Sequence, residues 1–89
     1  MNQHKKVIIY TLKTCAYCVK AKQLLHDKGI TFEEISVDNN PELRQQLAKK
    51  AGKTSVPQIW IGDFHVGGCD DLYIADSANK LDGLLSNTG

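Results

Sequence analysis

Apolar residues along the chain switch between two spacings, one typical of strands and one typical of helices. Residues 7–10 form a continuous β-prone run, as expected for a strand that is covered on both faces. Residues 16–28 instead repeat Cys18, Ala21 and Leu25 at helical spacing, which puts these side chains on one helix face. The pattern therefore predicts a first strand followed directly by a first helix.

The next two elements are indicated by charge and by helix-end signals. Residues 32–37 are β-prone but contain two consecutive glutamates, which favours a strand at the edge of a sheet. Asn40 followed by Pro41 is a strong helix start, because Asn caps free N–H groups and Pro is pre-organised for the first helical position. Gly52 then stands where that helix should end.

The last third of the chain predicts a hairpin and a final helical region. Residues 59–61 and 64–66 flank a two-residue Gly-Asp turn, and the helical region extends over residues 70–85. The first crossover implies a parallel pair of strands, and the hairpin adds an antiparallel pair. We therefore expect one α/β domain over residues 1–89, with the order β-α-β-α-β-β-α and a mixed four-stranded sheet between helices.

Composition narrows the classes of partner. The 89 residues are 42% hydrophobic and 24% charged, with a net charge of +1, so no basic surface for nucleic acid is expected. No apolar run approaches the ~20 residues that a membrane span needs, and no export signal is recognisable. We expect a monomer in the cytoplasm, where thiols are kept reduced and disulfides are usually transient.

The chain has three cysteines, and two of them form a C-x-x-C pair at the junction of the first strand and the first helix. A structural zinc site needs four ligands, and the distant Cys69 and three scattered histidines supply no second pair. A buried structural pair fits poorly at such a junction, which normally lies at the surface. A reactive dithiol is the better interpretation, because C-x-x-C beside a βαβ pattern is typical of redox proteins.

The position of Cys15 at the helix start explains why it should react. Free N–H groups and the positive end of the helix dipole stabilise a thiolate there, and the thiolate is the nucleophile. Lys13 and Lys20 add positive charge. Cys18 lies one turn further along the helix, so it should be less exposed. We therefore predict that Cys15 attacks and Cys18 resolves.

Several motifs together resemble the glutaredoxin family, most of all the small bacterial type called glutaredoxin 3. They are Tyr10-Thr11, Thr14-Cys15-Ala16-Tyr17-Cys18, Ala21-Lys22, Ser55-Val56-Pro57 and Gly67-Gly68-Cys69-Asp70-Asp71. The resemblance covers roughly residues 5–85 and implies a thioredoxin fold. It also implies glutathione as a cosubstrate, held in a groove beside the nucleophile, with no tightly bound cofactor and no resident metal.

The resemblance further implies a role for individual residues in binding glutathione. Tyr17 should flank the glutathione sulfur, and the Val56 backbone should pair with the glutathione cysteine beside a cis-Pro57. The γ-glutamyl end should meet the start of the last helical region. The implied contact residues are Lys13, Tyr17, Ser55, Val56, Pro57, Gly68, Cys69, Asp70 and Asp71.

Each of these residues also has an ordinary structural interpretation. Tyr17 could be a surface aromatic, and residues 55–57 could be only a turn before a strand. Asp70 and Asp71 could cap a helix, which does not exclude ligand binding. Cys69 is expected to be a small buried side chain without a catalytic role. The histidines should also be non-catalytic, and Trp60 should pack on the sheet.

Two positions depart from the family pattern. Ala16 stands where the family commonly has proline, so an extra amide lies beside the nucleophile. Leu12 stands where the family commonly has a lysine for the glycine carboxylate of glutathione, and Lys13 is its neighbour. Adjacent side chains on an extended segment point to opposite faces, so this substitution is open.

The main hypothesis is a glutathione-dependent thiol–disulfide oxidoreductase. Cys15 would attack a protein disulfide or a glutathionylated protein, and Cys18 would resolve a protein-bound intermediate. The alternative is a glutaredoxin dimer that binds a [2Fe–2S] cluster, in which two Cys15 and two glutathiones supply the four thiolates that a cluster needs. Ala16 keeps this alternative open, because some glutaredoxins that lack the proline bind a cluster.

Overall fold

A computed structural model describes residues 4–86 of the chain. The strands and helices follow one another in the predicted order, except that the final helical region consists of two helices. The elements are β1 Val7–Thr11, α1 Ala16–Asp27, β2 Glu33–Ser36, α2 Pro41–Ala51, β3 Gln58–Ile61, β4 Phe64–Gly67, α3 Cys69–Ser77 and α4 Leu81–Leu85.

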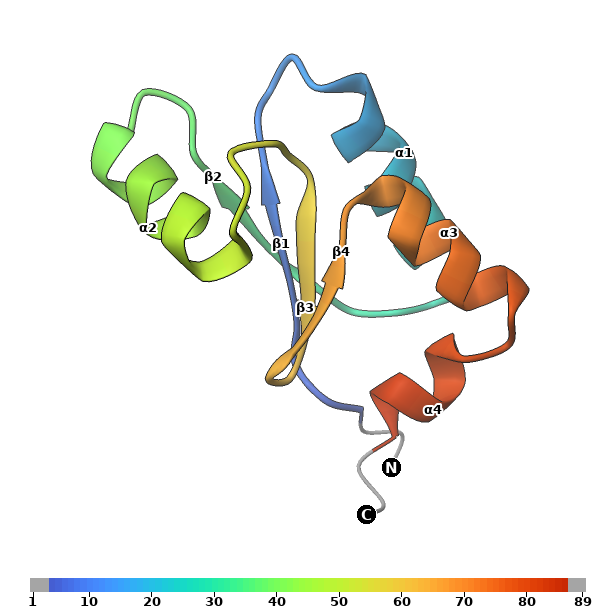
Figure 1. The fold of residues 1–89 in the computed structure, drawn as a ribbon. Helices are drawn as coiled ribbons and strands as arrows, with labels where there is room; N and C mark the ends of the chain where they lie inside the picture. Colours follow the sequence, from blue (N-terminus) through green and yellow to red (C-terminus); the bar gives the residue numbers. More distant parts are fainter. Residues whose placement is uncertain (1–3, 87–89) are drawn as a thin grey trace.

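The four strands form one mixed sheet, as predicted, and their order in the sheet is β2-β1-β3-β4. β1 pairs with β2 in parallel and with β3 antiparallel, and β3 and β4 form the antiparallel hairpin. β2 is an edge strand with exposed glutamates, which agrees with its charged sequence. The carboxyl end of β1 leads directly into α1, so the cysteine pair lies at one end of the sheet (Figure 1).

Helices cover both faces of the sheet. α1 and α3 lie side by side over one face, with α4 beyond them, and α2 lies over the other (Figure 1). The larger core lies between the sheet and α1, α3 and α4, and it contains Ile9, Leu25, Ile59 and Leu72. The smaller core lies under α2, where Leu47 contacts Trp60 and its neighbours. The larger core packs α1 and α3 against the same face of the sheet.

The helix ends follow from their capping residues. The Asn40 side chain accepts a hydrogen bond from the Leu43 N–H at 3.1 Å, and Pro41 is the first residue of α2. Gly52 ends α2 with a positive φ of 73°, which costs glycine nothing. These observations confirm the start and the end that the sequence indicates.

The final helical region differs from the prediction of one helix over residues 70–85. It is divided into α3 and α4, because Asn79 adopts a positive φ of 59° between them. Asn is one of the few non-glycine residues that enter this left-handed region readily. None of the helices in residues 4–86 has the length and apolar character that a membrane crossing requires.

Candidate functional site

Cys15 is the residue immediately before α1, in an extended backbone conformation, and it is half-buried. Its Sγ accepts a hydrogen bond from the Cys18 N–H at 3.2 Å. Its thiol also donates to the Val56 carbonyl oxygen, with a sulfur–oxygen distance of 3.6 Å. The first turn of α1 has no acidic residue, so no carboxylate of that turn offsets the partial positive charge there. The Cys15 sulfur therefore lies at the positive end of the α1 dipole and accepts a backbone N–H there.

Cys18 lies one turn inside α1 and is 1% exposed. Burial raises the pKa of its thiol to about 12, and the hydrogen bond with the Cys15 side chain contributes in the same direction. Cys18 is therefore a protonated thiol near neutral pH. It must lose a proton before it can attack a disulfide, which suits a residue that acts second.

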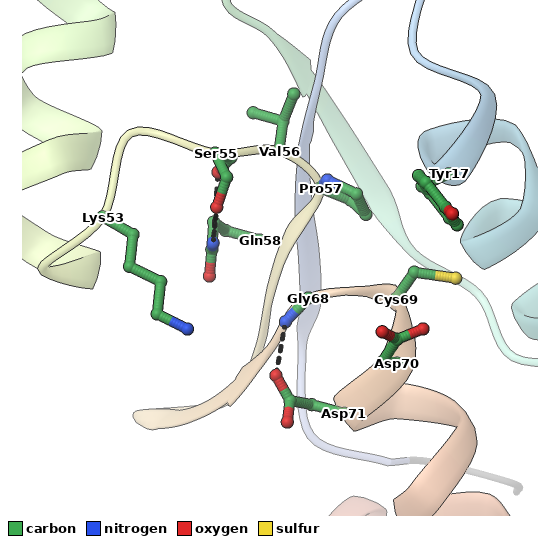
Figure 2. A pocket seen from close by; sticks show the side chains of 10 residues that line it. All are labelled: Tyr17, Lys53, Ser55, Val56, Pro57, Gln58, Gly68, Cys69, Asp70 and Asp71. Atoms are coloured by element: carbon green, nitrogen blue, oxygen red, sulfur yellow. Dashed lines mark hydrogen bonds between the residues drawn. The ribbon is translucent and has the colours of Figure 1, made fainter.

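A groove with a volume of about 190 Å³ opens beside the start of α1. Figure 2 shows that its lining side chains come from the start of α1, the loop between α2 and β3, and the start of α3. The lining residues are Tyr17, Lys53, Ser55, Val56, Pro57, Gln58, Gly68, Cys69, Asp70 and Asp71. The groove thus joins segments that lie far apart in the sequence.

The loop before β3 lines one side of the groove with Ser55, Val56 and Pro57, and Tyr17 of α1 also lines it. The Val56–Pro57 peptide bond is cis, as predicted. Pro57 is buried, whereas Ser55 is exposed and Val56 is half-buried. Tyr17 is 61% exposed, so its ring is free to cover a ligand.

The two aspartates at the start of α3 have different surroundings. The Asp71 carboxylate accepts a hydrogen bond from the Gly68 N–H at 3.0 Å and so caps α3 (Figure 2). A Cβ at Gly67 would collide with the same carboxylate, so a glycine is required beside it. Asp70 is exposed and lines the groove. Asp71 is exposed and lines the groove as well, so both carboxylates are open to a ligand, and only that of Asp71 also accepts the Gly68 N–H.

Cys69 is the first residue of α3 and is 5% exposed. Burial raises the pKa of its thiol, and the nearby negative charge of Asp70 acts in the same direction, against the attraction of Lys20. This environment agrees with the expected non-catalytic role. Within residues 4–86, no group of three His, Cys, Asp or Glu side chains is arranged to hold a metal ion.

The family model for glutaredoxins matches residues 7–66 of this chain. A relative from Pseudomonas aeruginosa, named Glutaredoxin, is 62% identical over 80 residues, which is 90% of this chain and 95% of the relative. The chain belongs to the glutaredoxin family. Glutaredoxin 3 of Escherichia coli strain K12 is 51% identical over 79 residues, covering 89% of this chain and 95% of the relative.

Solved glutaredoxin structures have the same fold. The solution structure of glutaredoxin from Brucella melitensis has a TM-score of 0.86 and 46% identity, over 99% of this chain and 96% of that one. A buckwheat glutaredoxin–glutathione complex has a TM-score of 0.84 and 26% identity, over 91% of this chain and 76% of that one. The mixed sheet flanked by helices is therefore the thioredoxin fold, and the family implies thiol oxidoreductase chemistry.

Most of the residues predicted to contact glutathione line the groove of this glutaredoxin. Lys13 does not line it. The Lys13 N–H donates to the Asp38 carboxylate at 2.9 Å, and its side chain borders a separate hollow with Leu12 and Val19. A cation is nevertheless present in the groove, because Lys53 lines it.

Sequence reasoning did not identify Lys53 and Gln58 as groove residues. Lys53 could have been found as the basic residue nearest to the predicted Ser55-Val56-Pro57 motif. Gln58 could have been found as a polar residue at the head of an otherwise apolar strand, where a buried amide needs hydrogen-bonding partners.

Proposed function

We propose that this glutaredoxin reduces protein disulfides and glutathionylated proteins at the expense of glutathione. One observation carries the proposal: the half-buried Cys15 caps the start of α1 with its sulfur, and its thiol contacts Val56, a residue that lines the groove. A ligand in that groove can place its own sulfur beside the nucleophile. Thiolate attack on a disulfide needs this proximity and alignment.

With a glutathionylated protein, the Cys15 thiolate attacks the glutathione sulfur of the mixed disulfide. A new bond forms between Cys15 and glutathione, and the protein sulfur leaves as a thiolate that takes up a proton. A second glutathione, as its thiolate, then attacks the adduct on the glutathione sulfur. Oxidised glutathione leaves, and the Cys15 thiolate is restored.

With a protein disulfide, Cys15 forms a mixed disulfide with one client sulfur and releases the other as a thiol. Cys18 loses its proton and attacks the Cys15 sulfur, which frees the client and leaves a Cys15–Cys18 disulfide. Two glutathiones then reduce this disulfide in succession, by way of the Cys15–glutathione adduct. The raised pKa of Cys18 supports its later role in this sequence, because burial keeps it protonated until the mixed disulfide has formed.

Glutathione offers groups that match the two ends of the groove. Its γ-glutamyl ammonium suits the exposed Asp70 carboxylate, and its γ-glutamyl carboxylate suits the free N–H groups at the start of α3. Its cysteine backbone can pair with Val56 as an added strand does. Lys53 supplies a cation for the glycine carboxylate, which is the role first expected of Lys13.

The test is turnover of a glutathionylated peptide, with glutathione, glutathione reductase and NADPH as the recycling system. The wild-type protein should release the peptide thiol catalytically, and the rate should depend on glutathione concentration. Replacement of glutathione by a simple thiol such as 2-mercaptoethanol should lower the rate, because such a thiol lacks the groups that the groove binds. Equal rates with both thiols would contradict the proposal.

A second candidate is the cluster-bridged dimer, which Ala16 favours because it stands in place of the usual proline. The half-exposed Cys15 sulfur at the edge of the groove is compatible with sharing between two chains. When bound, the cluster would supply iron–sulfur redox or carrier chemistry. An anaerobic visible absorption spectrum of the freshly purified protein separates the candidates, since a cluster absorbs in the visible range and a dithiol does not.

We propose that the enzyme form is a monomer that folds as one domain and works in the cytoplasm. The reaction depends on a pool of reduced glutathione, which a reducing compartment provides. Size-exclusion chromatography should give the mass of one chain, and thermal unfolding should show one cooperative transition. Two separated transitions would contradict the single domain.

A further inference from the structure

A hydrogen-bond chain centred on the buried side chain of Gln58 links the loop at the groove to β4, the neighbouring strand at the edge of the sheet. Gln58, the first residue of β3, is 2% exposed. Its Nε2 donates to the Ser55 carbonyl oxygen at 3.1 Å and to Ser55 Oγ at 3.3 Å (Figure 2). Its Oε1 lies 2.7 Å from Nε2 of His65 on β4. A buried amide with both ends paired is a strong conformational anchor.

The Ser55 carbonyl group determines the direction of each hydrogen bond in this chain. The Ser55 carbonyl oxygen can only accept, so the amide nitrogen of Gln58 must face it. The amide oxygen therefore faces His65, and His65 Nε2 must carry a hydrogen to donate. Both the neutral Nε2–H tautomer and the protonated ring satisfy this requirement.

The His65 ring is itself held in place by packing. It stacks on Trp60 with ring centroids 4.3 Å apart and an interplanar angle of 15°. Lys50 and Lys53 are the nearby cations and Asp71 is the nearby anion. Burial lowers the pKa of His65, the two lysines act in the same direction and Asp71 opposes them, so the ring is neutral at pH 7.

These hydrogen bonds bridge the loop segment that the ligand would contact. Ser55 and Gln58 are bonded across Val56 and Pro57, so their hydrogen bonds close this turn. Val56 also accepts the hydrogen bond from the Cys15 thiol. Loss of the His65 donor would leave the buried amide oxygen of Gln58 unpaired, and the amide would reorient away from Ser55 to satisfy it.

We propose that His65 is a positioning residue for glutathione, which acts through Gln58 to hold residues 55–57 in the conformation that binds the ligand. The proposal rests on the proposed function, since it concerns the same groove. His65 does not line the groove and has no direct contact with the ligand in this account. Its contribution is to the affinity for glutathione-containing substrates and not to the sulfur chemistry of Cys15.

Two matched variants separate the hydrogen bond from the packing. His65→Phe keeps an aromatic ring for Trp60 but has no donor, whereas His65→Gln keeps an N–H donor of similar reach but has no ring. The probe is a glutathionylated peptide in the glutathione-coupled assay. We expect His65→Phe to raise KM roughly 3- to 30-fold with kcat changed less than about threefold, the size of one lost buried hydrogen bond. His65→Gln should restore KM to within about threefold of wild type.

A double-mutant cycle tests the route through Gln58. In a Gln58→Met background no buried amide oxygen needs a donor, so His65→Phe should add less than about twofold to KM. The imidazole nitrogen signals of wild type in an NMR spectrum should show a hydrogen on Nε2 near neutral pH. Melting temperatures of all variants separate a general loss of stability from a change confined to the groove.

The outcomes distinguish this inference from the proposed function. If wild type does not turn over the glutathionylated peptide, the proposed function fails. If wild type is active and His65→Phe has the KM of wild type, only the role of His65 is overturned. A defect in His65→Gln that is absent from His65→Phe would assign the effect to ring stacking and would also overturn it. Additive KM changes in the Gln58→Met background would overturn the route through Gln58.

Discussion

Two helices begin at this groove, and each begins at a cysteine. Cys15 caps α1 and is half-buried, and the first turn of α1 has no acidic residue. Cys69 is the first residue of α3, is buried, and is followed by Asp70 and Asp71 in the first turn. At α1 the free N–H groups and the dipole can stabilise a thiolate. At α3 burial raises the pKa of the Cys69 thiol, and the nearby carboxylate of Asp70 acts in the same direction.

The comparison teaches that a helix start does not by itself activate a cysteine. Exposure and the sign of the neighbouring charges decide between a nucleophile and a buried structural thiol. Under the proposed function, the acidic start of α3 would suit the ammonium of a ligand, and the start of α1, whose first turn has no acidic residue, would suit an anionic sulfur.

The largest effect should follow removal of the nucleophile. Cys15→Ser should abolish turnover of both glutathionylated peptides and protein disulfides, because a serine hydroxyl is not ionised near neutral pH. Cys18→Ser should retain the reaction with glutathionylated peptide, which needs one thiol, and lose reduction of protein disulfides that need resolution. Both reactions can be followed in the same glutathione-coupled assay. Substantial turnover by Cys15→Ser would reverse the assignment of the two helix starts.

The reactivity of the three thiols should differ by a large factor in the folded wild-type protein. Iodoacetamide near neutral pH should label Cys15 on the order of 100-fold faster than Cys18 or Cys69, whose pKa values burial raises. Raising the pH should narrow the difference, and denaturation should remove it. Timed labelling with peptide mapping measures all three rates. Early labelling of Cys69 would mean that the acidic helix start does not suppress its thiolate.

The two aspartates of α3 form a matched pair. Asp70→Ala should raise KM for a glutathionylated peptide roughly 5- to 100-fold, with little change in melting temperature. The lower figure corresponds to the loss of a solvent-exposed charged contact and the higher figure to the loss of a desolvated one. Asp71→Ala should instead lower stability by about 1 kcal/mol, because it removes the cap on the Gly68 N–H. Kinetics and thermal melting of both variants test the difference. Equal effects on KM would show that the cap also shapes the ligand contact.

The smallest effect is expected at the second cysteine-bearing helix start. Cys69→Ala should retain most of its turnover, because the backbone N–H at this position remains and the sulfur takes no part in the reaction. Stability should fall by about 1 kcal/mol through the loss of buried packing. Chemical denaturation and the coupled assay measure the two quantities. Loss of activity comparable to that of Cys15→Ser would contradict the structural role of Cys69.

The order of the elements and the ends of α1 and α2 follow from local sequence. Short-range rules are sufficient there: a continuous β-prone run, an apolar helix face, Asn40 and Pro41 before α2, and Gly52 after it. The break between α3 and α4 was not predicted, because apolar residues continue at both sides of Asn79 and the left-handed conformation of this residue gives only a weak sequence signal.

The placement of Cys15 and Cys18 is a property of the sequence, since one short segment determines a strand end, a helix start and the spacing of two thiols. The tertiary structure determines which residues outside the sequence motifs line the groove, such as Lys53 and Gln58. Whether Lys13 or Lys53 lines it depends on how the loop after α2 packs beside the start of α1, about forty residues earlier in the chain. The bond from His65 through Gln58 to Ser55 likewise needs β3 and β4 to pair in register, and no local pattern specifies that contact.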